Sequence, residues 1–327
     1  MSETRPLVLA PGPHLHTSTT TARIMWWVNA TLVPAVLWGV YVFGPGALAV
    51  VAAAVAAAVA SEWLATRALG RRSAIGDGSA VCTGLLLALT LPPLVPWWMA
   101  ALGAAFAVLV GKMMFGGLGM NLFNPALAGR AFMMATFPLA MTSAWAVPRP
   151  GLGARLDAIT TPTPLAVLKE QGLEAAMKLI VGPGSVWNNL VLGFRPGSIG
   201  EVSVALIVLG AAVLVARGII GLTIPASVIA GTAIATAWSG APGLHLLGGG
   251  LWLGAFYMAT DYVTSPTTRG GQIVFGLVVG LLTGVIRMYG GYPEGICYAI
   301  LIGNALVPAL NLWFRPRRVA ALVGSPS

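Results

Sequence analysis

The chain has 327 residues, of which 57% are hydrophobic and only 8% are charged. A soluble domain carries about 25% charged residues, so this chain cannot cover a water-facing surface, and lipid must be the solvent for much of it. The net charge of +9 fits the excess of Lys and Arg that holds cytoplasmic loops in place. The sequence has no basic stripe and no basic amphipathic helix, which excludes nucleic acid as a partner.

Apolar runs near the length of about 20 residues that a bilayer requires predict an all-α polytopic membrane protein with about ten transmembrane segments. In chain order these segments are 24–43, 47–64, 79–91, 97–113, 123–145, 202–216, 219–238, 246–259, 273–288 and 295–314. The third and eighth are too short for a continuous lipid-facing helix, and each leads toward a proline turn. Irregular backbone survives at membrane depth only where protein or a cavity satisfies it. Both segments are therefore predicted to be broken helices.

The two halves of the chain resemble each other. Gly111-Lys112-Met113 is similar to Ile286-Arg287-Met288, and Pro92 and Pro266 precede these stretches by similar distances. Five segments in each half give the two halves opposite orientations, which predicts a 5+5 inverted repeat. The predicted regions are a cytoplasmic N-terminal segment (1–22), a first five-helix repeat (23–146), a periplasmic loop (147–200), a second five-helix repeat (201–314) and a cytoplasmic tail (315–327).

The distribution of basic residues predicts the orientation. With both termini in the cytoplasm of a bacterium and the helices in its inner membrane, the inside loops hold Arg67, Arg71, Arg72, Lys112, Arg217, Arg269, Arg315, Arg317 and Arg318. The short outside turns at 92–96 and 239–243 hold no charge. An excess of Lys and Arg on the cytoplasmic side is the pattern that fixes membrane topology.

The sequence predicts no metal site and no soluble-enzyme active site of its own. It has no phosphate-binding loop of the Walker type, no HExxH and no GxSxG. Cys82 and Cys297 lie far apart in apolar runs with no CxxC, so both are interpreted as buried small hydrophobes. The alternative is that one of them joins a cluster shared with a partner subunit. The pair His14 and His16 has no third ligand nearby and is interpreted as a polar feature of the N-terminal segment.

One stretch of the long outside loop has several hydroxyl side chains in a proline-containing turn: Asp157-Ala158-Ile159-Thr160-Thr161-Pro162-Thr163. By composition alone it is an ordinary Thr- and Pro-rich loop. It resembles, however, the flavinylation motif Asp-x-x-(Ser/Thr)-x-Ala-Thr of a membrane family that includes the RnfD component of Rnf complexes and the NqrB component of sodium-pumping NADH:quinone oxidoreductases.

The resemblance implies that Thr163 is esterified to the phosphate of FMN. Asp157 and Thr160 would be the other motif residues, and Thr160 and Thr161 are weaker candidates for the acceptor. Pro162 stands where the family usually has Ala. This departure bears on the local backbone conformation more than on the attachment of the flavin. A modifying flavin transferase needs to reach the hydroxyl, so we expect the Thr163 side chain to lie on an exposed loop.

Further matches extend the resemblance over nearly the whole chain. They include Asp77-Gly78-Ser79, Gly116-Gly117-Leu118-Gly119, Asn124-Pro125-Ala126, Thr260-Asp261 with Ser265-Pro266, and Gly290-Gly291-Tyr292-Pro293-Glu294-Gly295. The short N-terminal region favours the Rnf branch of the family. Asn124-Pro125 and Ser265-Pro266 break the chain near the inner membrane face, and their freed backbone groups are candidates to bind a flavin, with simple helix punctuation as the alternative.

The resemblance implies a membrane flavoprotein in an ion-pumping complex that couples NADH and ferredoxin chemistry to movement of Na⁺ or H⁺. Its cofactors would be covalent FMN and a noncovalent riboflavin within the membrane part. Its partners would be the other Rnf subunits, including an FMN-carrying subunit on the periplasmic side. Two other classes stay open from the residues: a solute channel, because the family's fold is similar to urea channels, and a passive scaffold for redox partners. Neither class has a use for the Thr163 motif.

Overall fold

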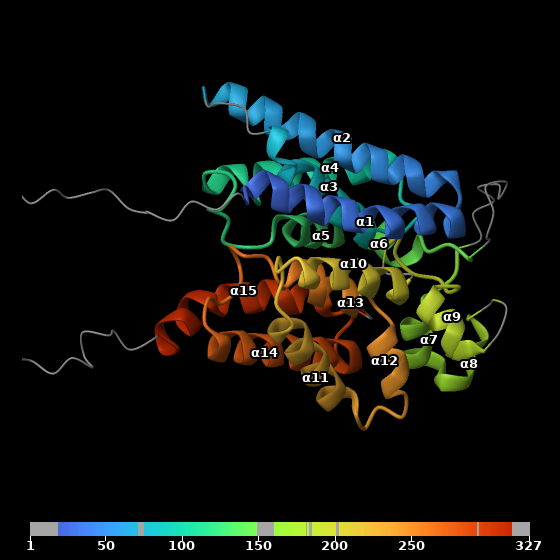
Figure 1. Cartoon of the computed structure of the whole chain (residues 1–327). Coiled ribbons are helices and arrows are strands. Elements are labelled where there is room, and N and C mark those ends of the chain that lie inside the picture. Colours follow the sequence, from blue (N-terminus) through green and yellow to red (C-terminus); the bar gives the residue numbers. More distant parts are fainter. Residues whose placement is uncertain are drawn as a thin grey trace, which may run out of the picture.

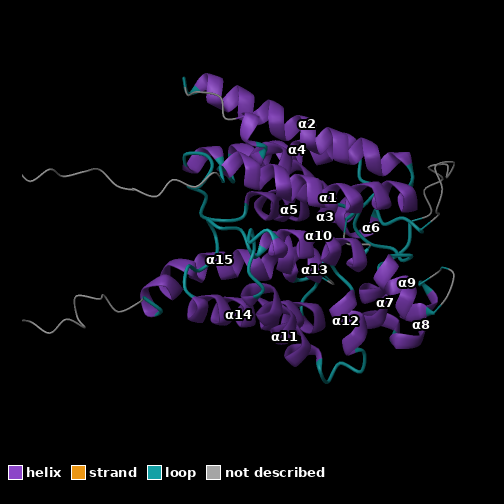
Figure 2. Ribbon diagram, in the orientation of Figure 1, coloured by secondary structure: helices purple, strands orange, loops and turns teal. Residues whose placement is uncertain are grey.

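The computed structural model describes residues 19–70, 75–148, 160–180, 182, 185–200, 203–292 and 294–315. Within these ranges the regular structure is helical, apart from one isolated antiparallel bridge between Ala146 and Thr160 (Figure 2). This confirms the prediction of an all-α protein for the described part of the chain.

The first half contains five principal helices: α1 (Thr21–Phe43), α2 (Pro45–Ala68), α3 (Ser79–Thr90), α4 (Trp97–Leu109) and α5 (Pro125–Thr136). The second half contains α10 (Val204–Ala216), α11 (Thr223–Thr236), α13 (Leu251–Leu253) continued by the π-helix η3 (Gly254–Met258), α14 (Arg269–Tyr289) and α15 (Ile296–Trp313). Shorter elements connect them: η1 (Ile75–Asp77), η2 (Met113–Phe115), α6 (Pro138–Ser143), α7 (Pro164–Gln171), α8 (Leu173–Lys178), α9 (Val186–Leu192) and α12 (Pro242–Leu247).

The two halves pack in the same order. In the first, α4 lies against both α2 and α5, and in the second, α14 lies against both α11 and α15. Equivalent helices also meet across the halves, because α1 contacts α10 and α5 contacts α15. This correspondence is what a repeat of five segments requires.

The helix lengths divide the spans into long and short ones. Among the described residues, five stretches are long and apolar enough to cross a membrane: Thr21–Phe43, Pro45–Ala68, Trp97–Phe115, Arg269–Tyr289 and Ile296–Trp313. The helices α3, α10 and α11 are apolar but shorter. The chain is therefore a multi-pass membrane protein with some short spans, and the number of ten crossings stays a prediction.

Two predicted segments are interrupted in the structure. The segment expected at 123–145 divides into α5 and α6 at Phe137-Pro138, because proline removes a helical N–H donor and clashes with the preceding turn. The segment expected at 246–259 begins inside α12 and continues as α13 and η3 after a glycine turn. Gly249 and Gly250 take φ values of +66° and +67° in this turn, a backbone conformation that favours glycine.

Small residues let the helices approach each other closely. A Cβ at Gly280 of α14 would lie 2.2 Å from the carbonyl oxygen of Val228 in α11, and a Cβ at Gly129 of α5 would lie 2.8 Å from the carbonyl oxygen of Gly103 in α4. Packing at small residues is the usual means of helix association in lipid, where apolar surface alone gives little driving force.

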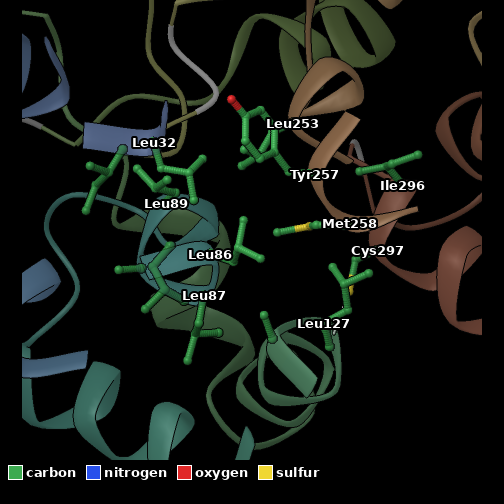
Figure 3. Close-up of a cluster of buried hydrophobic side chains, with 14 of the residues drawn as sticks. Leu32, Leu86, Leu87, Leu89, Leu127, Leu253, Tyr257, Met258, Ile296 and Cys297 are labelled. Atoms are coloured by element: carbon green, nitrogen blue, oxygen red, sulfur yellow. Dashed lines mark hydrogen bonds between the residues drawn. The ribbon is translucent and has the colours of Figure 1, made fainter. Parts of the chain in front are cut away.

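The core is built from both halves. Figure 3 shows Leu32 of α1 with Leu86, Leu87 and Leu89 of α3 on the left, Met258 of η3 and Ile296 of α15 on the right, and Leu127 of α5 below them. All of these side chains are buried. A common core means that the two halves form one packed body.

The bundle has two distinct ends. In Figure 1, α1 begins and α15 ends on one side, here named the termini end. The helices α7, α8 and α9 gather on the opposite side, here named the loop end. A small apolar cluster holds that group together, with Leu165, Ala176 and Leu190 packed around Leu244 of α12.

Candidate functional site

A pocket opens at the termini end. It encloses about 780 Å³ of empty space, counting its mouth. Its walls come from the first turns of α1 and α3, the chain before α5, and the stretch from Phe256 to Val263. Its polar lining residues are Ser79, Thr83, Lys112, Asn121, Asn124, Tyr257, Thr260, Asp261 and Tyr262, among apolar side chains such as Met25 and Leu214. Apolar walls with a few convergent polar groups are typical of cofactor sites.

Lys112 forms the charged side of this pocket. Its Nζ atom lies 2.8 Å from both carboxylate oxygens of Glu62 and donates to Ser79 Oγ at 2.6 Å. The Ser79 hydroxyl in turn donates to Asp77 at 2.5 Å. Glu62 and Lys112 are buried, and a buried charge persists only when it is paired and hydrogen-bonded. The network therefore fixes the start of α3 against the end of α2.

Asn124 joins the two halves of the chain beside the pocket. Its side chain caps α5 by accepting from the Leu127 N–H at 3.3 Å, and its Nδ2 donates to the carbonyl of Met258 at 3.3 Å. Its own N–H donates to Asn304 Oδ1 at 3.2 Å. Asn124 is thus a helix cap, as the punctuation interpretation predicts, and it also lines the pocket. Its predicted role in binding a flavin stays a prediction.

Asp261 and Ser265 belong to the second broken region. The Asp261 carboxylate lines the pocket and accepts from the Thr264 hydroxyl at 3.2 Å. Ser265 lies just beyond Val263, the last pocket-lining residue of that stretch. The structure therefore brings Asn124 and Asp261 together, and the predicted flavin-binding role of Ser265 stays a prediction.

Thr163 lies at the loop end and starts a helix. Its hydroxyl caps α7 by accepting from the Ala166 N–H at 3.3 Å. Pro164 at the first helical position suits this start, because its missing N–H would have no helical partner there. The side chain is buried, with 5% of the residue exposed. We expected an exposed hydroxyl on a loop, and that expectation was wrong, since the cap turns the oxygen toward its own helix.

The other motif residues have different environments. Thr160 is exposed and forms the bridge to Ala146, and the Thr161 N–H donates to the carbonyl of Trp145 at 3.2 Å. These two contacts tie the start of the motif to the chain after α6. Asp157 lies outside the described residues.

A second pocket surrounds Thr163. It is a narrow crevice of about 190 Å³, open solvent at its mouth included, with no room for a water-sized sphere; its lining residues are Thr163, Pro164, Leu165, Arg195, Pro196, Gly249 and Glu294. Arg195 and Glu294 are buried, and Glu294 is paired with Arg130 of α5. Arg195 and Arg130 were not among the residues predicted for the site. Their signal was available, because charged side chains in apolar surroundings of a membrane protein are usually paired and functional.

The two cysteines are free, buried thiols, in agreement with their interpretation as small core residues. Within the described ranges no group of three or more His, Cys, Asp or Glu side chains is placed to hold a metal ion.

The fold and the pockets at the termini end and around Thr163 define a class: a multi-pass, helical membrane protein that keeps polar and charged side chains inside the bundle at both ends. The chain belongs to the NQR2, RnfD, RnfE family, whose profile matches residues 8–320.

The chain is similar to curated proteins over nearly its whole length. One is the D-type subunit of the proton-translocating ferredoxin:NAD(+) oxidoreductase complex of Clostridium ljungdahlii, 42% identical over 316 residues that cover 94% of each chain. Another is the D-type subunit of the Na(+)-translocating ferredoxin:NAD(+) oxidoreductase complex of Acetobacterium woodii, 41% identical and covering 95% of this chain and 94% of the relative. A third is the D-type subunit of the ion-translocating oxidoreductase complex of Halorhodospira halophila, 36% identical over 94% of each chain.

Proposed function

We propose that this chain is the D-type membrane subunit of an ion-translocating ferredoxin:NAD⁺ oxidoreductase complex. The observation that carries the proposal is the full-length similarity to the D-type subunits of such complexes, at 42% and 41% identity. One of these relatives is named for proton and the other for Na⁺ translocation, so the proposed ion is H⁺ or Na⁺. The multi-pass fold suits a subunit that carries electrons across the bilayer.

In this proposal the chain holds two flavins. FMN is esterified to Thr163 at the loop end, and riboflavin occupies the pocket at the termini end without a covalent bond. Bound flavin supplies one-electron transfer, and the protein's task is to orient it and tune its electronics. At the termini end, Asn121, Asn124 and Thr83 line the pocket and would meet a ring edge or ribityl chain there, beside the Lys112–Glu62 ion pair.

The fit at the loop end rests on the geometry around Thr163. Its oxygen stands at the N-terminus of α7, where an anionic phosphoester is favourable. The hydroxyl is buried and already accepts a hydrogen bond. The proposed flavin transferase therefore acts on an open form of this segment, before Thr163 docks into its pocket.

The direct test is to isolate the complex, separate its subunits under denaturing conditions and record flavin fluorescence of this chain. Peptide mass spectrometry of the loop then locates the adduct. We expect one FMN mass on Thr163. A chain without flavin, or an adduct on Thr160 or Thr161, would contradict the residue assignment.

The proposed orientation places both termini in the cytoplasm of a bacterium and Thr163 on the periplasmic side of its inner membrane, near a partner subunit that carries its own FMN. Reporter fusions test this. A reporter after Val167 is expected to be active only in the periplasm, and one after Arg318 only in the cytoplasm. The structure places α7 and the end of α15 at opposite ends of the bundle (Figure 1). Two reporters on the same side would mean a miscounted span.

The noncovalent flavin is tested by filling its pocket. Met25 lines the pocket from α1, and Met25→Trp adds a large ring at this wall. We expect the riboflavin content of the purified complex to fall several-fold, with the FMN on Thr163 unchanged. Ala30→Trp is the matched control, since Ala30 is an exposed residue of the same helix. Equal riboflavin content in both variants would place the second flavin elsewhere.

A solute channel or a passive scaffold is the alternative class. The relatives, which match over nearly their full length, are named as subunits of oxidoreductase complexes and not as channels. Electron transport with ion translocation is therefore the function that we propose.

A further inference from the structure

One buried amide joins the two broken regions of the chain behind the pocket at the termini end. Asn304 lies in the middle of α15 and is 1% exposed. Its Oδ1 accepts from the N–H of Asn124 at 3.2 Å, and its Nδ2 donates to the carbonyl of Thr264 at 2.8 Å. Asn124 belongs to the first half of the chain and Thr264 to the second. A single side chain therefore holds the backbone of both halves at one point.

The two backbone groups that Asn304 binds lie outside regular helices. Asn124 precedes the first residue of α5, and Thr264 lies in the irregular stretch between η3 and α14. An unpaired backbone group inside a membrane protein is strongly unfavourable, and neighbouring side chains supply the missing partners. Asparagine suits this position because its amide offers both an acceptor and a donor on one short, neutral side chain. Asn304 therefore stabilises both chain breaks.

Each of the two bonds leads to a polar residue that lines the pocket. Asn124 lines it directly, and its Nδ2 donates to the carbonyl of Met258 at 3.3 Å. Thr264 is tied to Asp261, because its hydroxyl donates to the Asp261 carboxylate at 3.2 Å and its N–H donates to the Asp261 carbonyl at 3.3 Å. Asp261 lines the pocket from the second half of the chain. Asn304 is not among the lining residues, so it acts on a ligand only through Asn124 and Asp261.

We propose that Asn304 is the positioning residue that sets the spacing of Asn124 and Asp261 in the pocket, and with it the way in which a flavin is held there. This inference rests on the proposed occupancy of the pocket by riboflavin. A binding site needs its polar groups held within about 0.5 Å of the productive geometry by neighbours that are themselves fixed. Asn304 meets this requirement because it is buried in a long helix and both of its bonds end on backbone atoms.

The test compares the purified complex carrying the native chain with complexes carrying Asn304→Leu or Thr232→Val. Leucine has nearly the shape of asparagine but no polar group, so both bonds are lost. Thr232 is the matched control, because it is buried in α11, its hydroxyl donates to the carbonyl of Gly280 in α14 at 3.2 Å, and it does not line the pocket. The readouts are the dissociation constant of riboflavin, the visible circular dichroism of bound riboflavin and the midpoint of thermal unfolding.

Both substitutions are expected to lower the unfolding midpoint by a few degrees, because each removes hydrogen bonding between buried elements. Only Asn304→Leu is expected to weaken riboflavin binding, by about tenfold. It is also expected to change the circular dichroism bands of the flavin, which report the asymmetry of its surroundings. A residue that served stability alone would lower the midpoint and leave both flavin readouts as they are in Thr232→Val.

Asn304→Gln is the test variant if Asn304→Leu does not assemble. It keeps the acceptor and the donor on an arm that is one methylene longer, so the backbone groups of Asn124 and Thr264 keep a partner while their spacing changes. We expect this complex to assemble, to bind riboflavin several-fold more weakly than the native complex and to show altered circular dichroism bands.

The outcomes separate this inference from the proposed function. If the native complex contains no noncovalent riboflavin, or if Met25→Trp leaves its content unchanged, the pocket assignment fails and the role of Asn304 fails with it. If Met25→Trp displaces riboflavin but the Asn304 variants bind it as the native chain does, with the same circular dichroism, only the role of Asn304 is overturned. If Thr232→Val changes the flavin readouts as much as Asn304→Leu, a general loss of rigidity and not this contact is responsible, which also overturns it.

Discussion

Replacement of Thr163 by Asn is expected to give an assembled complex that carries no covalent FMN on this chain and has little electron transfer between NADH and ferredoxin. Asn has no hydroxyl to esterify, yet it caps a helix at least as well as Thr. The start of α7 should therefore survive, although Thr163 is buried there. The measurements are subunit content, flavin mass and turnover of the purified complex.

The loss is large because the tether sets the local concentration of the flavin. A tethered group sits at an effective concentration in the millimolar range, which free FMN in a cell does not reach. Ion pumping, which the redox reaction drives, should fall with turnover. Normal turnover in a Thr163→Asn complex without flavin on this chain would mean that the electron path bypasses it.

Two companion variants separate attachment from folding. Thr163→Ser keeps both the cap and an acceptor hydroxyl, and is expected to keep covalent flavin. Thr163→Ala loses both, and loss of a helix cap costs about 1 kcal/mol. The difference between the Asn and Ala variants therefore measures how much the helix cap contributes to stability. The difference between the Asn and Ser variants measures how much the covalent flavin contributes to turnover. Thr160→Ala should be milder than Thr163→Asn or Thr163→Ala, because the acceptor oxygen is kept.

The all-helical, multi-pass character of the chain could be predicted because lipid imposes length and hydropathy on a chain. The start of α5 was readable from Asn124-Pro125, a cap followed by a proline that suits the first helical turn. The break at Phe137-Pro138 carries the same kind of signal, but it lies inside a long apolar run that reads as one span. Local chemistry thus predicts where helices start and stop.

The environment of Thr163 could not be predicted in this way. Its burial depends on Arg195, 32 residues further along the chain, and on the glycine turn at 248–250, which meets α7 only in the folded bundle. A single sequence contains no distance information of this range. The motif predicts which residue would carry the flavin, and tertiary packing decides how the oxygen of that residue is presented.

The environment of Lys112, at the termini end, could not be predicted from the sequence either. The sequence placed it in an inside loop, where a basic residue reads as a topology signal. The structure instead buries it against Glu62, 50 residues earlier in the chain. The available signal was Glu62 itself, an acid within a long apolar helix, which is rare unless it is paired.

Lys112→Met is accordingly expected to destabilise the chain strongly. It leaves the Glu62 carboxylate buried with its counter-charge removed, and breaking a buried ion pair from one side costs about 3–5 kcal/mol. A loss of that size should lower the midpoint of thermal unfolding in detergent by on the order of 10 °C. The Ser79 hydroxyl loses its bond from Lys112 as well, so the start of α3 and the pocket that it lines should loosen.

The double variant Lys112→Met with Glu62→Met distinguishes an effect on folding stability from an effect on flavin binding. Replacing both members of a buried pair by apolar side chains of similar size is often neutral or stabilising, so the unfolding midpoint should return near that of the native chain. Riboflavin content should not return with it if the Lys112 charge takes part in binding the flavin, because the double variant restores packing and not charge. A single Lys112→Met chain with an unchanged midpoint would mean that the pair is not buried in the membrane-embedded protein, and the charged wall of the pocket would then have to be assigned to other residues.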